Sequence, residues 1–187
     1  AETTTGNVIG TVEADGKKTG IKALLTAETK FGVKPRILGC PELDTKDVAV
    51  ELAGIAQQLR AFAYVYAAGA TTKEDAATYR ENFGQREMMV IWPEFVAFGV
   101  NANTTRTAPA VARALGMRAK IDQQTGWHKT ISNIPVNGVS GISKDVFWDL
   151  QDPNTDAGYL NANEVTTLIN SGGFRFWGSR TCSIDPL

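Results

Sequence analysis

The sequence predicts an α/β protein with a layered core, in which a mainly parallel sheet is flanked by helices. Two observations lead to this prediction. Short runs that are apolar at nearly every position alternate with longer segments whose apolar residues recur every three or four positions. Strands that are apolar throughout are buried on both faces, and the helices between them are typical crossovers of a parallel sheet. The 187 residues are enough for one such domain with its own core.

Five short runs are predicted to be strands, and the run from Ala61 to Ala67 is the most central because it is aromatic and β-branched. The predicted strands lie near Asn7–Val12, Ile37–Gly39, Phe62–Tyr66, Met88–Trp92 and Phe174–Trp177. The last of them follows a predicted helix. We therefore expect it to lie beside the other parallel strands.

The first two predicted helices have clear start and stop signals. Thr19 can cap a helix that Gly32 ends, and its apolar residues fall on one face. Asp44 or Thr45 opens the second helix. The apolar residues of the second helix keep a four-three-four spacing, which is one helical stripe. They are Val48, Leu52, Ile55 and Leu59.

Three further helices are predicted between the later strands. Thr71 and Glu74 form a capping box at the start of one that Gly84 ends. A strong helix is expected over Thr107–Asp122, with a proline in its first turn. A short helix is expected from Asn163 to Ile169, directly before the last strand.

The segment after Gly126 has many turn-forming residues and no clear period, so a long ordered loop region is predicted there. Order is expected because several large apolar side chains would be costly to leave in water. They are Trp127, Ile131, Ile134, Val136, Phe147 and Trp148.

Composition excludes several classes of protein. The net charge of −1 gives no attraction to nucleic acid or to an anionic membrane. No apolar run approaches the roughly 18 residues that span a bilayer. The first residues have neither the basic nor the apolar region of a signal peptide. The two cysteines, Cys40 and Cys182, are not a CxxC pair, and we expect both to be reduced, packed thiols.

Two segments resemble ligand-binding loops but have the wrong spacing. Gly10 and Gly16 enclose five residues where a phosphate loop needs four, so a surface turn is predicted. Asp152, Asn154 and Asp156 match the first positions of a calcium loop. The glycine and glutamate that should follow are each one residue late, so the segment is predicted not to bind calcium.

No catalytic or cofactor-binding constellation is present. His128 is the single histidine and its neighbours include no nucleophile, so a structural role is expected for it. Neither a GxSxG, an HExxH nor a GxGxxG motif occurs. We therefore predict no catalytic residue, no cofactor and no metal.

Three pieces in the second half of the chain carry a family resemblance: the proline-containing helix at Thr107–Ile121, the loop "GWHK", and "FRFWGSRT" from Phe174 to Thr181. In these pieces the chain resembles the tail sheath proteins of contractile-tailed bacteriophages. "GVKPRILGCPELDTKDVAVELA" and "QREMMVIWPEF" extend it over nearly all of the chain. The resemblance implies that the protein is a subunit of a structural polymer and not an enzyme.

The resemblance implies a function and a set of partners. Sheath subunits stack as hexameric rings around the tail tube, between a baseplate and a tail terminator, and contract to drive the tube through the host envelope. The sheath subunits are joined by extended terminal arms, which add strands to the sheets of neighbouring subunits. The implied location is the virion tail, assembled in the bacterial cytoplasm, with no direct nucleic-acid contact and no membrane insertion.

The resemblance also implies a domain organisation. Residues 1–18 are expected to be a short strand and turn that lead in from a missing N-terminal part. Residues 19–187 are expected to be the sheath core domain, truncated before the C-terminal part, and to be monomeric at micromolar concentration. Arg175 and Arg180 could pair with acidic groups, either within the subunit or on a neighbour. The alternative function is a small flavodoxin-like nucleotide-binding or enzymatic domain, with its ligand at the carboxyl ends of the strands.

Overall fold

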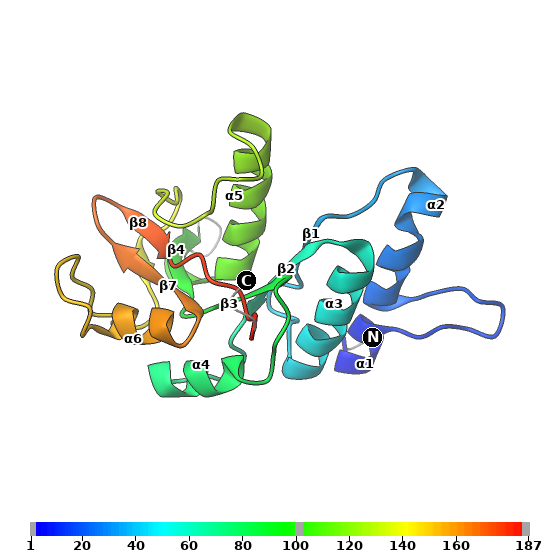
Figure 1. Cartoon of the computed structure of the whole chain (residues 1–187), viewed down its shortest axis with the longest axis horizontal. Coiled ribbons are helices and arrows are strands. Elements are labelled where there is room, and N and C mark those ends of the chain that lie inside the picture. Colours follow the sequence, from blue (N-terminus) through cyan, green and yellow to red (C-terminus); the bar gives the residue numbers. More distant parts are fainter. Residues whose placement is uncertain (1–2, 100–102, 185–187) are drawn as a thin grey trace.

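A computed structural model describes residues 3–99 and 103–184 of the chain. A five-stranded sheet in the order β1-β2-β3-β7-β8 forms its centre (Figure 1). The first four strands are parallel, and β8 runs antiparallel to β7. The strands are β1 (Ile37–Leu38), β2 (Phe62–Tyr66), β3 (Met88–Ile91), β7 (Val165–Asn170) and β8 (Phe174–Trp177). The predicted mainly parallel α/β core is confirmed.

A second, three-stranded antiparallel sheet has the order β5-β4-β6. Its strands are β4 (Phe95–Gly99), β5 (Thr104–Ala108) and β6 (Gly141–Ile142). The sequence pattern does not predict this sheet. The helix expected to start at Thr107 starts at Ala110 instead, because the residues before it pair with β4.

Helices lie along both faces of the main sheet (Figure 1). The α-helices are α1 (Thr5–Ile9), α2 (Ala27–Phe31), α3 (Lys46–Leu59), α4 (Lys73–Arg80), α5 (Ala110–Gln124) and α6 (Asp156–Ala162). A 3₁₀-helix, Gly20–Thr26, leads into α2, which ends at Gly32 in the left-handed conformation, as the sequence predicts. The capping box of α4 is formed by Thr72 and Asp75, one residue later than predicted.

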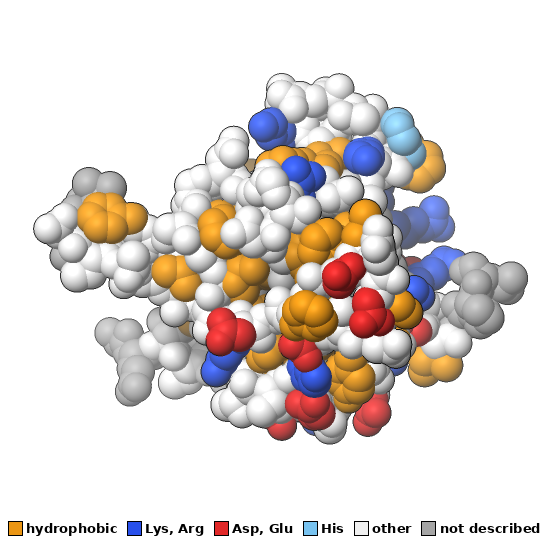
Figure 2. All heavy atoms as spheres, turned by 90° about the vertical axis from the view of Figure 1, so that its left-hand side faces the viewer, with side chains coloured by type: hydrophobic (Ala, Val, Ile, Leu, Met, Phe, Trp, Pro, Cys, Tyr) orange, Lys and Arg blue, Asp and Glu red, His pale blue; other side chains and the backbone are white. Residues whose placement is uncertain are grey.

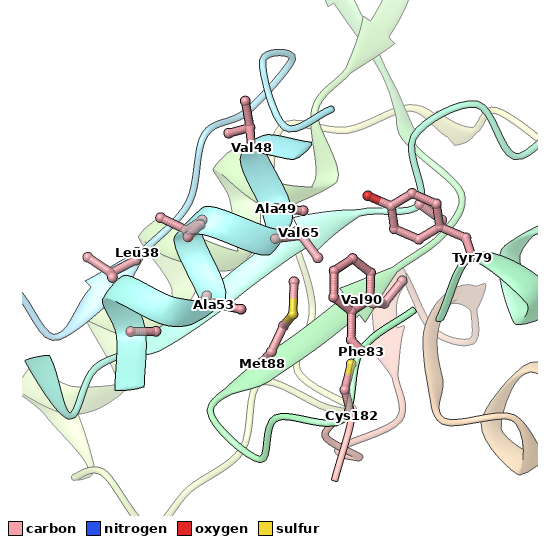
Figure 3. Packing of buried hydrophobic residues seen from close by; sticks show 14 of the residues in the cluster. Leu38, Val48, Ala49, Ala53, Val65, Tyr79, Phe83, Met88, Val90 and Cys182 are labelled. Atoms are coloured by element: carbon pink, nitrogen blue, oxygen red, sulfur yellow. The ribbon is translucent and has the colours of Figure 1, made fainter. Parts of the chain in front are cut away.

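One hydrophobic cluster lies between the sheet and α3, which buries seven of its residues. Figure 3 shows part of this cluster, in which Val65, Met88 and Val90 extend from the sheet beside α3. The stripe predicted on this helix is buried throughout. A second cluster on the opposite face joins the sheet to α5 and β4, with Phe95 and Phe176 in edge-to-face contact at its centre.

Two predicted elements are wrong, and local chemistry explains both. The expected strand Asn7–Val12 begins as helix α1, because the Thr4 hydroxyl accepts a hydrogen bond from the Asn7 amide. The expected helix Asn163–Ile169 is strand β7. Thr155 caps α6 earlier, so Asn163 ends a helix instead of opening one, and the β-branched residues that follow favour a strand.

The last strand is also placed differently from the prediction. Phe174–Trp177 is a strand, but it forms a tight hairpin with β7 and is not a parallel neighbour. Because β7 is itself a strand, the chain only has to reverse through Ser171–Gly173 to pair with it. Gly172 and Gly173 supply the positive φ angles of this turn.

Candidate interaction surfaces

The loop that resembles a phosphate site is held by its own groups. Asp15 accepts a hydrogen bond from the Lys17 amide, and the Lys17 ammonium lies 3.9 Å from Glu13. Gly10 approaches Thr19 so closely that a Cβ at position 10 would lie 2.0 Å from the Thr19 carbonyl oxygen. The glycine therefore closes the base of a surface loop, as predicted.

The residues that resemble calcium ligands are directed to other partners. The Asp152 carboxylate accepts a hydrogen bond from the Asn154 amide at 2.8 Å. Asp156 pairs with Lys73 of α4 and also accepts a hydrogen bond from the Phe147 backbone amide. Both contacts lower the pKa of the Asp156 carboxyl. Glu164 pairs with Arg80. That this segment binds no calcium stays a prediction, and these contacts support it.

The other candidates from the sequence lie apart from one another. His128 is exposed, Cys40 is half-buried and Cys182 is buried, with both thiols free. Burial raises the pKa of Cys182 to about 11, so it stays a thiol at neutral pH. Within residues 3–99 and 103–184, no three His, Cys, Asp or Glu side chains come together to hold a metal ion.

At the carboxyl ends of the parallel strands, where a flavodoxin-like protein would hold its ligand, two carboxylates support the fold. Asp44 accepts a hydrogen bond from the Tyr66 amide at 2.7 Å. Glu94 accepts one from the Ala110 amide, at the start of α5. Burial raises the pKa of Glu94 to about 7. Both carboxyl groups accept backbone amides of the fold and supply no positive charge to a phosphate, so this edge does not favour nucleotide binding.

The segment before α6 exposes apolar and acidic side chains together. Phe147 is 59% exposed and Leu150 is 74% exposed. The Trp148 ring packs edge-to-face on Trp177, with 5.2 Å between the ring centroids. We call this surface the acidic–aromatic patch. It comprises Asp145, Phe147, Trp148, Asp149, Leu150, Asp152 and Trp177. Figure 2 shows hydrophobic and acidic side chains side by side on this side of the molecule.

A groove beside α5 has the opposite electrostatic character. Its volume is about 470 Å³. Side chains from the starts of β2 and β3 form its floor, and arginines and an exposed tryptophan border it. We call it the basic groove. Its principal lining residues are Arg36, Arg60, Phe62, Tyr64, Met89 and Trp127.

The loop after α5 is fixed where it borders the basic groove. The buried Arg118 guanidinium donates hydrogen bonds to the carbonyl oxygens of Gly126 and Lys129 and pairs with Asp122 at 2.6 Å. The backbone on both sides of Trp127 is therefore held in place. The indole itself is 87% exposed.

The large apolar side chains of the loop region were predicted to be buried. This prediction is correct for part of the region and wrong for Trp127 and Phe147. Ile131 and Val136 are buried, and Ile134 and Trp148 are partly buried. The sequence contained the signal for the patch, namely large apolar residues between aspartates. It did not show which of them the core would leave uncovered.

The two arginines singled out near the end of the chain have no acidic partner in the part of the chain that the structure describes. Arg175 instead donates to the carbonyl oxygens of Ser171 and Asn133, at 2.7 and 3.0 Å. Within the described residues, Arg175 therefore contacts neutral carbonyl oxygens instead of an acidic group. Arg180 is exposed between two residues of the basic groove, and pairing of either arginine with an acidic group, within the subunit or on a neighbour, stays a prediction.

The fold is an α/β module whose surface carries the acidic–aromatic patch and the basic groove. The profile of the family described as phage tail sheath protein central domain matches residues 16–182. The chain belongs to this family, as its resemblance to sheath proteins predicts. No helix among the described residues is long and apolar enough to cross a membrane.

Similar proteins agree with this family. The chain is 61% identical over 184 residues to the tail sheath protein of Escherichia phage P2, covering 98% of this chain and 46% of that protein. It is 55% identical over 185 residues to the major tail sheath protein of Serratia phage KSP20, covering 99% of this chain and 47% of that protein. The chain thus spans about half the length of these relatives.

The same fold occurs in a solved assembly. The helical sheath of the anti-feeding prophage in its contracted state matches with a TM-score of 0.62 at 21% identity, over 94% of this chain and 46% of that one. At this identity the match establishes the fold alone.

Proposed function

We propose that the chain is the central part of a contractile tail sheath subunit, which surrounds the tail tube and contracts to drive it through the host envelope. The observation that carries this proposal is the 61% identity to the tail sheath protein of Escherichia phage P2 along nearly the whole chain. A subunit of this kind needs a stable core and surfaces that make and break contacts. The two hydrophobic clusters and the exposed surfaces meet those needs.

The partners follow from this role. They are other sheath subunits in hexameric rings, the tail tube, the baseplate and the tail terminator. The location is the virion tail, after assembly in the bacterial cytoplasm. The protein performs no catalysis in this role. Residues 1–18 serve as a lead-in segment and residues 19–187 as the core domain.

A flavodoxin-like nucleotide-binding function is the weaker candidate. The sheet order and the carboxylates Asp44 and Glu94 at the strand ends provide no phosphate cradle. A thermal-shift screen with nucleotides, flavins and divalent metals tests this candidate directly. We expect no ligand to raise the unfolding temperature.

The test of the sheath function is a chimera. In phage P2, the matched 184-residue segment of the sheath gene is replaced by the corresponding segment of this chain. We expect electron microscopy to show tails with complete sheaths that contract on the host. The control chimera carries Phe176→Asp, which places a charge in the second cluster and should abolish the sheath. Tubes without sheath from the unmutated chimera, with the chimeric protein soluble, would contradict the proposal.

A further inference from the structure

We infer that the acidic–aromatic patch of one subunit binds the basic groove of a second copy of this chain, in a head-to-tail contact. This inference rests on the proposed function and specifies the surfaces through which two core domains meet. Three observations on the described residues support it: complementary charge, exposed apolar side chains on both surfaces, and the position of the surfaces on opposite faces of the sheet.

The charges of the two surfaces are opposite, and most of them form no ion pair among the described residues. Residues 145–156 contain four aspartates and no lysine or arginine. Of the four, Asp156 alone takes part in an ion pair among the described residues. The remaining three are exposed. A partner with positive charge would compensate them.

The basic groove supplies that positive charge. Arg36 donates both of its hydrogen bonds to neutral carbonyl oxygens, those of Leu59 and Arg60, at 2.9 Å each. Its charge therefore stays uncompensated. Neither Arg60 nor Arg180 forms an ion pair in residues 3–99 and 103–184. The one carboxylate that lines the groove, Asp122, is paired with Arg118.

Apolar side chains are exposed on both surfaces. The patch presents Phe147 and Leu150, and the groove has a floor of Phe62 and Met89 beside the exposed Trp127. An apolar side chain that enters such a groove removes its own surface and that of the floor from water, which is favourable in proportion to the area covered. The second copy thus matches the groove in apolar character and in charge.

The positions of the two surfaces determine the kind of assembly. Side chains alternate between the two faces of a strand. Phe176 lies in the cluster on the α5 side, so its neighbour Trp177 points to the other face, where the patch lies. Tyr64 and Met89, in the floor of the groove, belong to the α5 side. Because the two surfaces differ and lie on opposite faces, their contact is heterologous and builds rings or filaments instead of closed two-fold dimers.

The contact is expected to be weak. The exposed charges attract each other only weakly in water, and salt screens them. We expect a dissociation constant near the millimolar range, which corresponds to roughly 4 kcal/mol. The chain is then a monomer at tens of micromolar, and self-association appears as the concentration approaches millimolar.

Two triple variants of the 187-residue chain test the inference. The patch variant carries Asp149→Asn, Leu150→Ser and Asp152→Asn, in which each asparagine keeps an oxygen to accept the local hydrogen bond of the aspartate that it replaces. The groove variant carries Arg60→Gln, Trp127→Ser and Arg180→Gln. Circular dichroism and urea unfolding establish that both variants are folded. Sedimentation velocity from 50 µM to 1 mM, in low salt, then gives their mass.

The expected results are specific to a head-to-tail contact. The wild-type chain increases in average mass with concentration, and each variant alone stays monomeric. An equimolar mixture of the two variants retains one intact patch and one intact groove, so it forms heterodimers that grow no further. A control variant with Phe31→Ser, a 77% exposed residue outside both surfaces, associates like the wild type.

Three outcomes would overturn the inference: a wild-type chain that stays monomeric at 1 mM, a variant that self-associates like the wild type, or a mixture that remains monomeric. None of these outcomes affects the chimera test. A chimera that builds a contractile sheath, together with a monomeric mixture, would leave the proposed function standing and assign the contacts to other surfaces.

Discussion

The two faces of the main sheet differ in how completely they are covered. On the face of α3, Leu38 and Ala63 are buried. On the face of α5, the preceding residue of each strand, Ile37 and Phe62, remains partly exposed. Helix α5 and β4 cover only part of that face, and the basic groove occupies the rest. Both faces of the same strands carry a hydrophobic cluster, but the α5 face also leaves apolar surface available to a partner.

A large effect on stability is expected on the covered face. Leu52→Ala removes a side chain of α3 that is fully buried, and a cavity of this kind costs roughly 2–5 kcal/mol in the free energy of unfolding. Equilibrium unfolding in urea measures it. Val50→Ala, on the same helix but 51% exposed, is the matched control, and its effect should stay within about 0.5 kcal/mol. Equal losses from the two substitutions would contradict the covered-face assignment.

A smaller effect is expected at the floor of the groove. Phe62→Ala removes a ring that is partly exposed in the monomer, so we expect a loss of about 1–2 kcal/mol in the free energy of unfolding. The buried Phe176 is the comparison, because Phe176→Ala should cost roughly 3–5 kcal/mol. Urea unfolding of both variants decides the point. If Phe62→Ala cost as much as Phe176→Ala, the groove would be part of the core.

The parallel strands β1, β2 and β3 and the long helices α3 and α5 could be predicted from the sequence because their signals are local. A strand buried on both faces is a continuous apolar run, as in Phe62–Tyr66, and α3 shows its stripe by spacing alone. The β4–β5 hairpin was missed because β5 is exposed at four of five positions, and pairing with β4 makes it a strand. Such a segment has no pattern of its own.

The surfaces were less predictable than the fold for a related reason. The exposure of Trp127 depends on where Arg118, nine residues earlier, holds the loop. Neighbouring residues do not determine it. The charge of the patch, by contrast, could be read directly from the run of aspartates in residues 145–156. Composition therefore predicts the chemistry of a surface, while the tertiary fold determines which side chains reach it.

The free energy of unfolding is expected to depend on pH through Glu94, which lies where the two sheets meet. Burial raises the pKa of Glu94 to about 7, against an ordinary value of 4.5, with Asp44 and Glu42 adding to the shift. The folded state therefore favours the protonated carboxyl. This contribution to stability is fully present below pH 4.5 and is lost as the pH rises through about 7.

Glu94→Gln isolates this group, because the amide oxygen can still accept the hydrogen bond of the Ala110 amide and does not titrate. Between pH 5 and pH 8, the wild-type chain should lose about 1 kcal/mol more unfolding free energy than the variant, a figure reduced for the partial exposure of Glu94. Urea unfolding at the two pH values measures the difference. Titrating groups that do not interact with Glu94 contribute equally in both proteins and cancel. Identical pH dependence of the two proteins would contradict the assignment.

The smallest effect on stability is expected at Trp127, although it is the largest side chain on the groove. Its indole is 87% exposed and its backbone is held by Arg118, so Trp127→Ser should change the free energy of unfolding by no more than about 0.5 kcal/mol. Ile131→Ala, four residues later but fully buried, should cost roughly 2–5 kcal/mol. Urea unfolding at low protein concentration measures both without interference from self-association. A loss above 2 kcal/mol for Trp127→Ser would show that the indole supports the fold. An exposed tryptophan that contributes nothing to folding is instead available for contact with a neighbouring subunit.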